Sequence, residues 1–248
     1  TMPGRGATYQ APKFDFNTAA GCIEALKSPN YATRYMAWTA LHAMGGKAEA
    51  ELQKLLASDN PVYRARALWL LGKTEGRGPE VVAKAITDRD ADIRIVGLRL
   101  ARQLDDVDAI DVAGKLASDK SAQVRRECAI ALANSDSDKV PQIWAQLASQ
   151  HDGQDRWYLE ALGIGARGRW DACVDAWLEN VGGPDAAIKS AAGRDIVWRS
   201  RAKKTPGLLA KILQSGDTAA EAKPRYFRAF DFLTGPEKDE ALKGLLGL

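Results

Sequence analysis

The residues best suited to chemistry lie between positions 150 and 171, where acidic, aromatic and imidazole side chains are concentrated. A histidine beside two carboxylates can bind a metal ion or exchange a proton as an acid–base pair. The same stretch suits a structural corner, because Asp152 is a good helix N-cap and Gly153 a good turn residue. We favour the interpretation of this stretch as a structural corner. The residues of this stretch that we predict to bind a partner are His151, Asp155, Trp157, Tyr158 and Trp170.

Two charged runs could also bind ligands. The acidic run from Asp105 to Asp111 could hold Ca²⁺, but it lacks the glycine and the closing glutamate of an EF-hand loop. The basic run from Arg199 to Lys204 could contact phosphates. Cations near a helix C-terminus also stabilise the helix dipole, which is the simpler interpretation. We therefore predict no metal, cofactor or small-molecule site on this chain.

The composition is that of a soluble globular protein. The 248 residues are 46% hydrophobic and 27% charged, with 35 Lys and Arg against 32 Asp and Glu, a net charge of +3. This balance is too small to indicate a nucleic-acid or membrane partner by itself. No apolar run approaches the roughly 18 residues of a transmembrane helix, so we expect no membrane insertion. Thr1 before Met2 favours an excised fragment.

The three cysteines are far apart and form no CxxC or CxxCH motif, which excludes a covalent haem site of that type. Cys22, Cys128 and Cys173 each stand among apolar residues of helix-like stretches. Buried free thiols are therefore predicted.

An internal repeat of about 30 residues organises the chain. Five arginines recur at spacings of 30, 30, 31 and 31, namely Arg34, Arg64, Arg94, Arg125 and Arg156. Four residues before each comes a residue that caps helices well: Asn30, Asn60, Asp90, Ser121 and Asp152. We predict that these pairs serve as caps and as a ladder of bonds between repeats, with Asp90 and Arg94 as the best example.

The apolar pattern keeps the same register. Small or apolar residues follow each arginine at three, six and seven positions, which is one face of an α-helix. A second amphipathic segment precedes each cap, so the unit is a helix, a turn and a helix. The predicted fold is all-α, a HEAT-like α-solenoid of about seven helix pairs and a closing helix at Pro236–Leu248. Residues 1–16 are predicted to be a linker and residues 17–248 the solenoid, regular over 17–181 and divergent over 182–248.

Three phrases are similar to a narrower family. They are FDFNTAAGCIEALKSPNYATRYMAWTALHAMG (14–45), DADIRIVGLRLAR (90–102) and QHDGQDRWYLEALGIGARGRWD (150–171). Together they resemble the HEAT-like region of large planctomycete-type multidomain proteins described as membrane-bound dehydrogenases or haem-binding proteins. The resemblance implies a dehydrogenase-like propeller and a c-type cytochrome module elsewhere in a parent protein, and an exported, periplasmic location. It places no catalytic residue and no cofactor on this chain.

The expected function is therefore a non-catalytic protein-interaction or scaffold module, with a protein or a neighbouring domain as partner. One alternative is a HEAT-like nucleic-acid-binding protein or DNA-repair glycosylase, which would use a concave basic face. Another is a bilin-lyase-like protein that acts on a pigment. Solenoids commonly bind through the concave surface, which the arginine-bearing second helices would line here.

Overall fold

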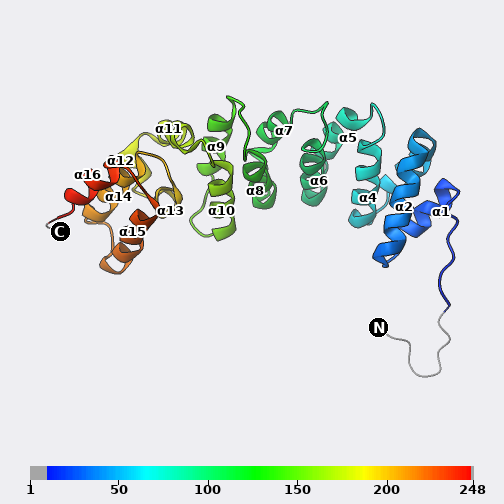
Figure 1. The fold of residues 1–248 in the computed structure, drawn as a ribbon, viewed down its shortest axis with the longest axis horizontal. Coiled ribbons are helices and arrows are strands. Elements are labelled where there is room, and N and C mark those ends of the chain that lie inside the picture. Colours follow the sequence, from blue (N-terminus) through cyan, green and yellow to red (C-terminus); the bar gives the residue numbers. More distant parts are fainter. Residues whose placement is uncertain (1–9, 247–248) are drawn as a thin grey trace, which may run out of the picture. The chain divides into compact units, whose positions relative to one another are not determined.

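The computed structural model describes residues 10–246, and this part of the chain consists of helices and turns without a strand (Figure 1). The predicted all-α class is confirmed. Residues 10–16 of the predicted linker precede the first helix, and residues 1–9 lie outside the described part. The predicted closing helix is shorter than expected, since α16 covers Pro236–Lys243.

The chain forms two compact units, Thr1–Val107 and Asp108–Leu248, and the division falls inside the predicted run of regular repeats. In the first unit each helix packs on the next as a pair, and the second helices α2, α4 and α6 also pack on one another. Its elements are α1 (Ala19–Leu26), α2 (Tyr31–Met44), η1 (Gly45–Ala48), α3 (Glu49–Leu56), α4 (Pro61–Gly72), α5 (Gly78–Ala85) and α6 (Ala91–Ala101).

The second unit has two layers. Helices α7, α9 and α11 pack side by side along one edge, and α8, α10, α13 and α15 form the other layer (Figure 1). Its elements are α7 (Ala109–Leu116), α8 (Ala122–Ala131), α9 (Val140–Ala148), α10 (Arg156–Gly165), α11 (Trp170–Val181), α12 (Pro184–Ala187), α13 (Ala191–Arg199), α14 (Thr205–Gln214), η2 (Ala220–Ala222), α15 (Lys223–Ala229), η3 (Phe230–Phe232) and α16.

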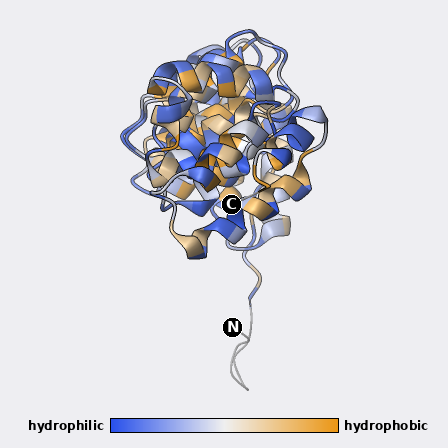
Figure 2. Cartoon of the chain, turned by 90° about the vertical axis from the view of Figure 1, so that its left-hand side faces the viewer, coloured by the Kyte–Doolittle hydropathy of each residue, from blue (hydrophilic) through white to orange (hydrophobic). Residues whose placement is uncertain are grey.

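The core of each unit is made by the predicted apolar face. Hydrophobic and hydrophilic stretches alternate along the helices (Figure 2). The residues three positions after each arginine are all buried: Ala37, Ala67, Gly97, Cys128 and Leu159. At Gly97 a Cβ atom would lie 2.8 Å from the Cβ of Ala85, so the missing side chain lets α6 approach α5 closely.

The helix caps follow the prediction in the first unit and depart from it in the second. Side-chain oxygens of Asn30, Asn60 and Asp90 accept hydrogen bonds from backbone N–H groups of the first turn. Ser121 holds the cap position of α8, but its hydroxyl makes no capping bond.

The prediction that Asp152 caps the helix α10 is wrong. Its Oδ1 accepts bonds from the backbone N–H groups of Gln154 (2.8 Å) and Asp155 (3.1 Å), which turns the chain before the helix begins. These bonds lower the pKa of Asp152. Asp155 is the cap of α10 instead, and its Oδ1 accepts from the N–H of Tyr158 at 2.9 Å. Arg156 consequently starts the helix rather than standing in its second turn.

Three of the five repeated arginines bind backbone carbonyls of the turn that precedes their own helix. The guanidinium of Arg34 donates to the carbonyl of Pro29 at 2.7 Å, and that of Arg125 donates to Asp119 at 2.7 Å. Arg94 reaches the carbonyl six positions earlier at 2.8 Å, and Arg194 of α13, which is not one of the five, does the same at 2.6 Å. A charge-assisted bond to a turn carbonyl holds each of these turns against its helix.

A ladder contact between repeats joins Arg64 of α4 to Asp88. Asp88 lies in the turn, two residues before the cap Asp90. The acidic residue of this ladder contact is therefore Asp88, whereas the prediction had assigned that role to Asp90. Arg156 makes a different contact from its counterparts, since its guanidinium pairs with Glu160 one helical turn later, at 2.7 Å.

Candidate functional site

Two of the five predicted partner-binding residues are buried in the second unit. The rings of His151 and Tyr158 stack with centroids 6.0 Å apart and planes 10° apart. Tyr158 is 2% exposed, and its hydroxyl donates to the carbonyl of Leu147 at 2.9 Å. Burial raises the pKa of Tyr158. Neither side chain offers a surface to a partner.

The other three predicted residues lie in different surroundings. Asp155 is occupied as the cap of α10. Trp170 is partly buried and packs edge-on against Trp144, with ring centroids 5.9 Å apart and planes at 75°. Trp157, in the first turn of α10, is 71% exposed. The five residues therefore do not form one patch, and Trp157 is the member that a partner can reach most easily.

A different set of side chains gathers around α10 and α13, which we call the arginine–aromatic face. The guanidinium carbons of Arg225 and Arg156 lie 4.4 and 5.5 Å from the centroid of the Trp198 ring. The face consists of Arg156, Glu160, Trp170, Asp195, Trp198, Arg199, Arg201, Arg225 and Phe232. Stacked guanidinium groups gain from the electron-rich face of an aromatic ring while their edges stay available as donors.

The face continues toward the C-terminal end of α13. Arg199 lies over Trp170 at 6.0 Å, and Arg201 lies over Phe232 at 5.0 Å. Phe232 is 59% exposed, so part of its ring faces solvent. Arg201 is anchored by its Nη1, which donates to the carbonyls of Ser200 (2.6 Å) and Arg199 (3.0 Å).

Two carboxylates position the arginines. Glu160 accepts from Arg156 through Oε1 and from the Nε of Arg199 through Oε2, at 2.8 and 2.9 Å. Asp195 Oδ1 lies 2.7 Å from the Nη2 of Arg225, and its Oδ2 lies 3.5 Å from the Nε2 of buried His151.

Both carboxylates are ionised near neutral pH. Burial acts to raise the pKa of Glu160, but the two arginine hydrogen bonds outweigh it and the pKa is lowered. Burial likewise acts to raise the pKa of Asp195, and the contacts with His151 and Arg225 lower it overall. The four arginines of the face thus exceed its carboxylates by two positive charges.

A cavity of about 460 Å³ adjoins the arginine–aromatic face. The cavity lies between the start of α11 and Arg201, which comes two residues after the end of α13. It is lined by Gly168, Arg169, Trp170, Asp171, Ala172 and Arg201. Arg169 donates to the carbonyl of Ser137 at 2.7 Å, and Asp171 Oδ1 accepts from the N–H of Lys203 at 2.6 Å. Burial and the nearby charge of Arg199 lower the pKa of Arg201.

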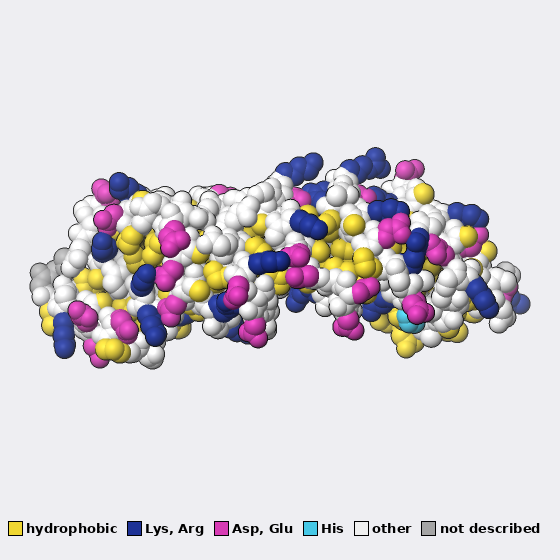
Figure 3. All heavy atoms as spheres, turned by 90° about the horizontal axis from the view of Figure 1, so that it is seen from above, with side chains coloured by type: hydrophobic (Ala, Val, Ile, Leu, Met, Phe, Trp, Pro, Cys, Tyr) yellow, Lys and Arg dark blue, Asp and Glu magenta, His cyan; other side chains and the backbone are white. Residues whose placement is uncertain are grey.

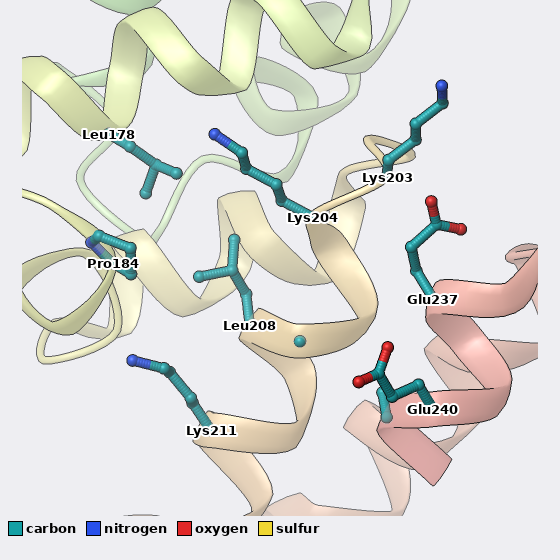
Figure 4. Close-up of a pocket in the computed structure, with 10 residues that line it drawn as sticks. Leu178, Pro184, Lys203, Lys204, Leu208, Lys211, Glu237 and Glu240 are labelled. Atoms are coloured by element: carbon teal, nitrogen blue, oxygen red, sulfur yellow. The ribbon is translucent and has the colours of Figure 1, made fainter.

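A second cavity, of about 590 Å³, lies among α11, α12, α14 and α16 (Figure 4). Its apolar side is formed by Leu178, Pro184 and Leu208, and Glu237 and Glu240 stand on α16. Two of its lysines are paired, since Lys204 lies 2.6 Å from Asp175 and Lys211 lies 2.6 Å from Asp185. Lys203, Glu237 and Glu240 also line this cavity, so it carries charges of both signs.

The predicted basic run 199–204 does not form a single basic surface. Arg199 and Arg201 belong to the arginine–aromatic face, whereas Lys204 lines the other cavity. Positive and negative side chains are also interspersed over the side of the molecule seen from above (Figure 3).

The cysteine prediction is confirmed, since Cys22, Cys128 and Cys173 are buried free thiols. Burial raises the pKa of Cys128 and of Cys173 to about 12. Within residues 10–246, no three His, Cys, Asp or Glu side chains gather as metal ligands. None of the helices in that range is long and apolar enough to cross a membrane.

The sequence prediction missed Glu160, Asp195, Trp198 and Arg225 as site residues. They come from α10, α13 and α15, and no spacing within one repeat relates them. A comparison with models of known protein families finds no match to this chain, and a comparison with curated protein sequences finds none either.

Proposed function

We propose that this chain is a protein-interaction scaffold without catalytic chemistry of its own, and that it binds its partner through the arginine–aromatic face. In this proposal each unit is a stretch of HEAT-like α-solenoid. Residues 10–246 then contain seven helix pairs, from α1/α2 to α14/α15 with α12 as an insertion, and α16 follows them. The hydrogen bonds from arginines to turn carbonyls support this assignment, because the same local contact recurs along the chain, as expected for a repeat protein.

The observation that carries the binding proposal is the arginine and tryptophan content of the face, in which Arg156 and Arg225 are exposed and Trp170 and Trp198 are half-buried. Arginine and tryptophan are the residues most enriched among those that dominate the binding energy of protein interfaces. Arg156 and Arg225 both lie over the ring of Trp198, and Trp157, which adjoins Arg156 in the sequence, is 71% exposed. A partner would bury these side chains without first having to reorganise them.

The test is site-specific photo-crosslinking in cells of the source organism. A photoreactive phenylalanine analogue replaces Trp157, and in a matched control it replaces Gln142, which is exposed on α9 in the other layer. We expect position 157 to form a covalent adduct with a discrete protein and position 142 to form none. Identical adducts at both positions, or none at 157, would contradict the proposal.

We further propose that the scaffold is part of a larger exported redox protein of the planctomycete type, with its dehydrogenase and haem chemistry on other domains. The support is the resemblance of residues 14–45, 90–102 and 150–171. An antibody to this chain should then detect a native polypeptide much larger than 26.9 kDa with a c-type haem spectrum. A colourless product of about this size would rule out that parent protein.

Nucleic-acid binding, as in HEAT-like DNA-repair glycosylases, is the second candidate. The observation that favours it is the stacking of Arg225 and Arg156 on Trp198, since arginines and aromatic rings also bind unpaired bases. A salt-dependent mobility shift with DNA would support it. Absence of binding at low salt would eliminate it.

A further inference from the structure

The arginine–aromatic face and its adjoining cavity together define the chemistry of a ligand. We propose that the face binds an acidic segment of a partner protein, and that one carboxylate of this segment enters the cavity between Arg169 and Arg201. The inference rests on the proposed interaction function and adds the chemical class of the partner.

The charge of the face favours an anionic segment. Glu160 binds Arg156 and Arg199, and Asp195 binds Arg225, yet two positive charges of the face remain in excess. The side chain of Arg225 is partly exposed, and that of Arg156 is largely exposed. Their free guanidinium edges can each donate further hydrogen bonds to carboxylates.

The cavity provides a place for a single carboxylate. Arg201 uses Nη1 for the carbonyls at the end of α13, and Arg169 uses Nη1 for the carbonyls of Ser135 and Ser137. Arg169 and Arg201 line the same cavity as Trp170 and Asp171, and Nη2 of Arg169 lies 3.8 Å from Asp138. The backbone anchors fix their positions, so a carboxylate would meet two oriented donors at little entropic cost.

The fixed carboxylates favour a peptide over a nucleic acid. Glu160 and Asp195 stand among the arginines of the face, and they would repel a strand that carries a phosphate at every nucleotide. A peptide can place neutral residues opposite these carboxylates and acidic residues opposite the arginines. The aromatic rings of Trp198 and Phe232 then contact its apolar side chains.

The experiment is calorimetric titration of the full chain with a short blocked peptide of alternating glutamate and alanine. We expect binding that weakens with salt, and no binding of the matched glutamine–alanine peptide. Arg201→Gln should weaken binding of the acidic peptide about tenfold or more, in line with the loss of one charge-assisted contact. Arg89→Gln, which removes an exposed arginine of the first unit, should leave the affinity unchanged within about twofold.

A second variant keeps the test valid if Arg201→Gln fails to fold. Ala172→Glu adds a carboxylate to the cavity at an exposed position in the first turn of α11, where a negative charge is favourable for the helix. It should weaken binding of the acidic peptide without lowering stability. Equal binding of the acidic and neutral peptides, or no effect of either variant, would overturn the inference.

Parallel titrations with inorganic phosphate and with a short oligothymidylate test whether the face binds a phosphate group or a nucleic acid instead of an acidic peptide. Arg201-dependent binding of either one, without binding of the acidic peptide, would also overturn the inference. If crosslinking at position 157 captures a protein while the acidic peptide does not bind, only the acidic class of partner is wrong. If neither experiment succeeds, the interaction function itself fails.

Discussion

Arg199 occupies the space that a side chain at Gly163 would need. A Cβ atom on Gly163 would lie 2.3 Å from Cζ and 2.4 Å from Nη2 of Arg199. The bare backbone of α10 at this point lets the guanidinium from α13 lie across it and reach Glu160, at 2.9 Å, and the ring of Trp170. A missing side chain in one helix thus positions a cation supplied by another.

Gly163→Ala should displace Arg199 without unfolding the protein. The atoms in the way belong to the end of a flexible side chain, and alanine is favoured over glycine in a helix by about 1 kcal/mol. We therefore expect an equal or higher free energy of unfolding, together with loss of the Arg199–Glu160 contact. Chemical denaturation measures the first effect, and a crystal structure of the variant measures the second.

Gly165→Ala is the matched control two residues later. There a Cβ atom would lie 2.3 Å from the carbonyl oxygen of Ala129, which belongs to the backbone of α8 and cannot rotate away. We expect a loss of about 1–3 kcal/mol, typical of overpacking. Equal stability changes in the two alanine variants would show that Arg199 does not lie where the structure has it.

Trp157 and Tyr158 should respond oppositely to substitution although they are adjacent. Trp157→Ala should change the free energy of unfolding by less than about 0.5 kcal/mol, because the ring is largely exposed. Tyr158→Phe should cost about 0.5–1.5 kcal/mol, because the carbonyl of Leu147 loses its bond from the buried hydroxyl and retains the backbone N–H of Gln150, at 3.1 Å. Thermal and urea denaturation of both variants test this. Partner binding should fall in the Trp157 variant, and a comparable loss of stability there would contradict its exposure.

Arg64 and Asp88 should be energetically coupled. Both side chains are largely buried and join α4 to the turn before α6. A double-mutant cycle with Arg64→Gln and Asp88→Asn should give a coupling energy of about 0.5–3 kcal/mol. The exposed pair Glu80–Lys84 is the control, and its coupling should be no more than about 0.5 kcal/mol. Equal couplings for both pairs would argue against a ladder role for Arg64.

Stability should fall as the pH rises from about 9 to about 12. Burial raises the pKa of Cys128 and of Cys173 to about 12 in the folded protein, from 9.0 for the exposed thiol. Between these values the unfolded chain has lost thiol protons that the folded chain keeps, so folding becomes less favourable with pH. Denaturation at a series of pH values measures the slope.

Cys128→Ala should reduce this pH dependence, and a thiol reagent should label the native protein slowly and the unfolded protein fully. Fast labelling of the native protein would contradict the burial of the thiols. An unchanged slope in Cys128→Ala would assign the pH dependence to other groups.

The sequence by itself determined the helical register of this protein. Caps such as Asn60 and anchors such as Arg125 act on backbone groups within six residues, so their effects follow from local spacing alone. The buried helix face at Ala37, Ala67 and the equivalent positions follows from the 3.6-residue period of apolar residues. This period can be recognised within the sequence of a single helix. The burial of the cysteines follows from the same period.

The tertiary structure decided where α10 begins and which residues form the arginine–aromatic face. Asp152 and Asp155 are both good caps, and the choice between them depends on the turn that connects α9 to α10. Arg199 reaches Glu160 across 39 residues because α13 packs on α10 and Gly163 leaves room. Contacts of this kind depend on the angle and distance between packed helices, which no spacing within a repeat encodes.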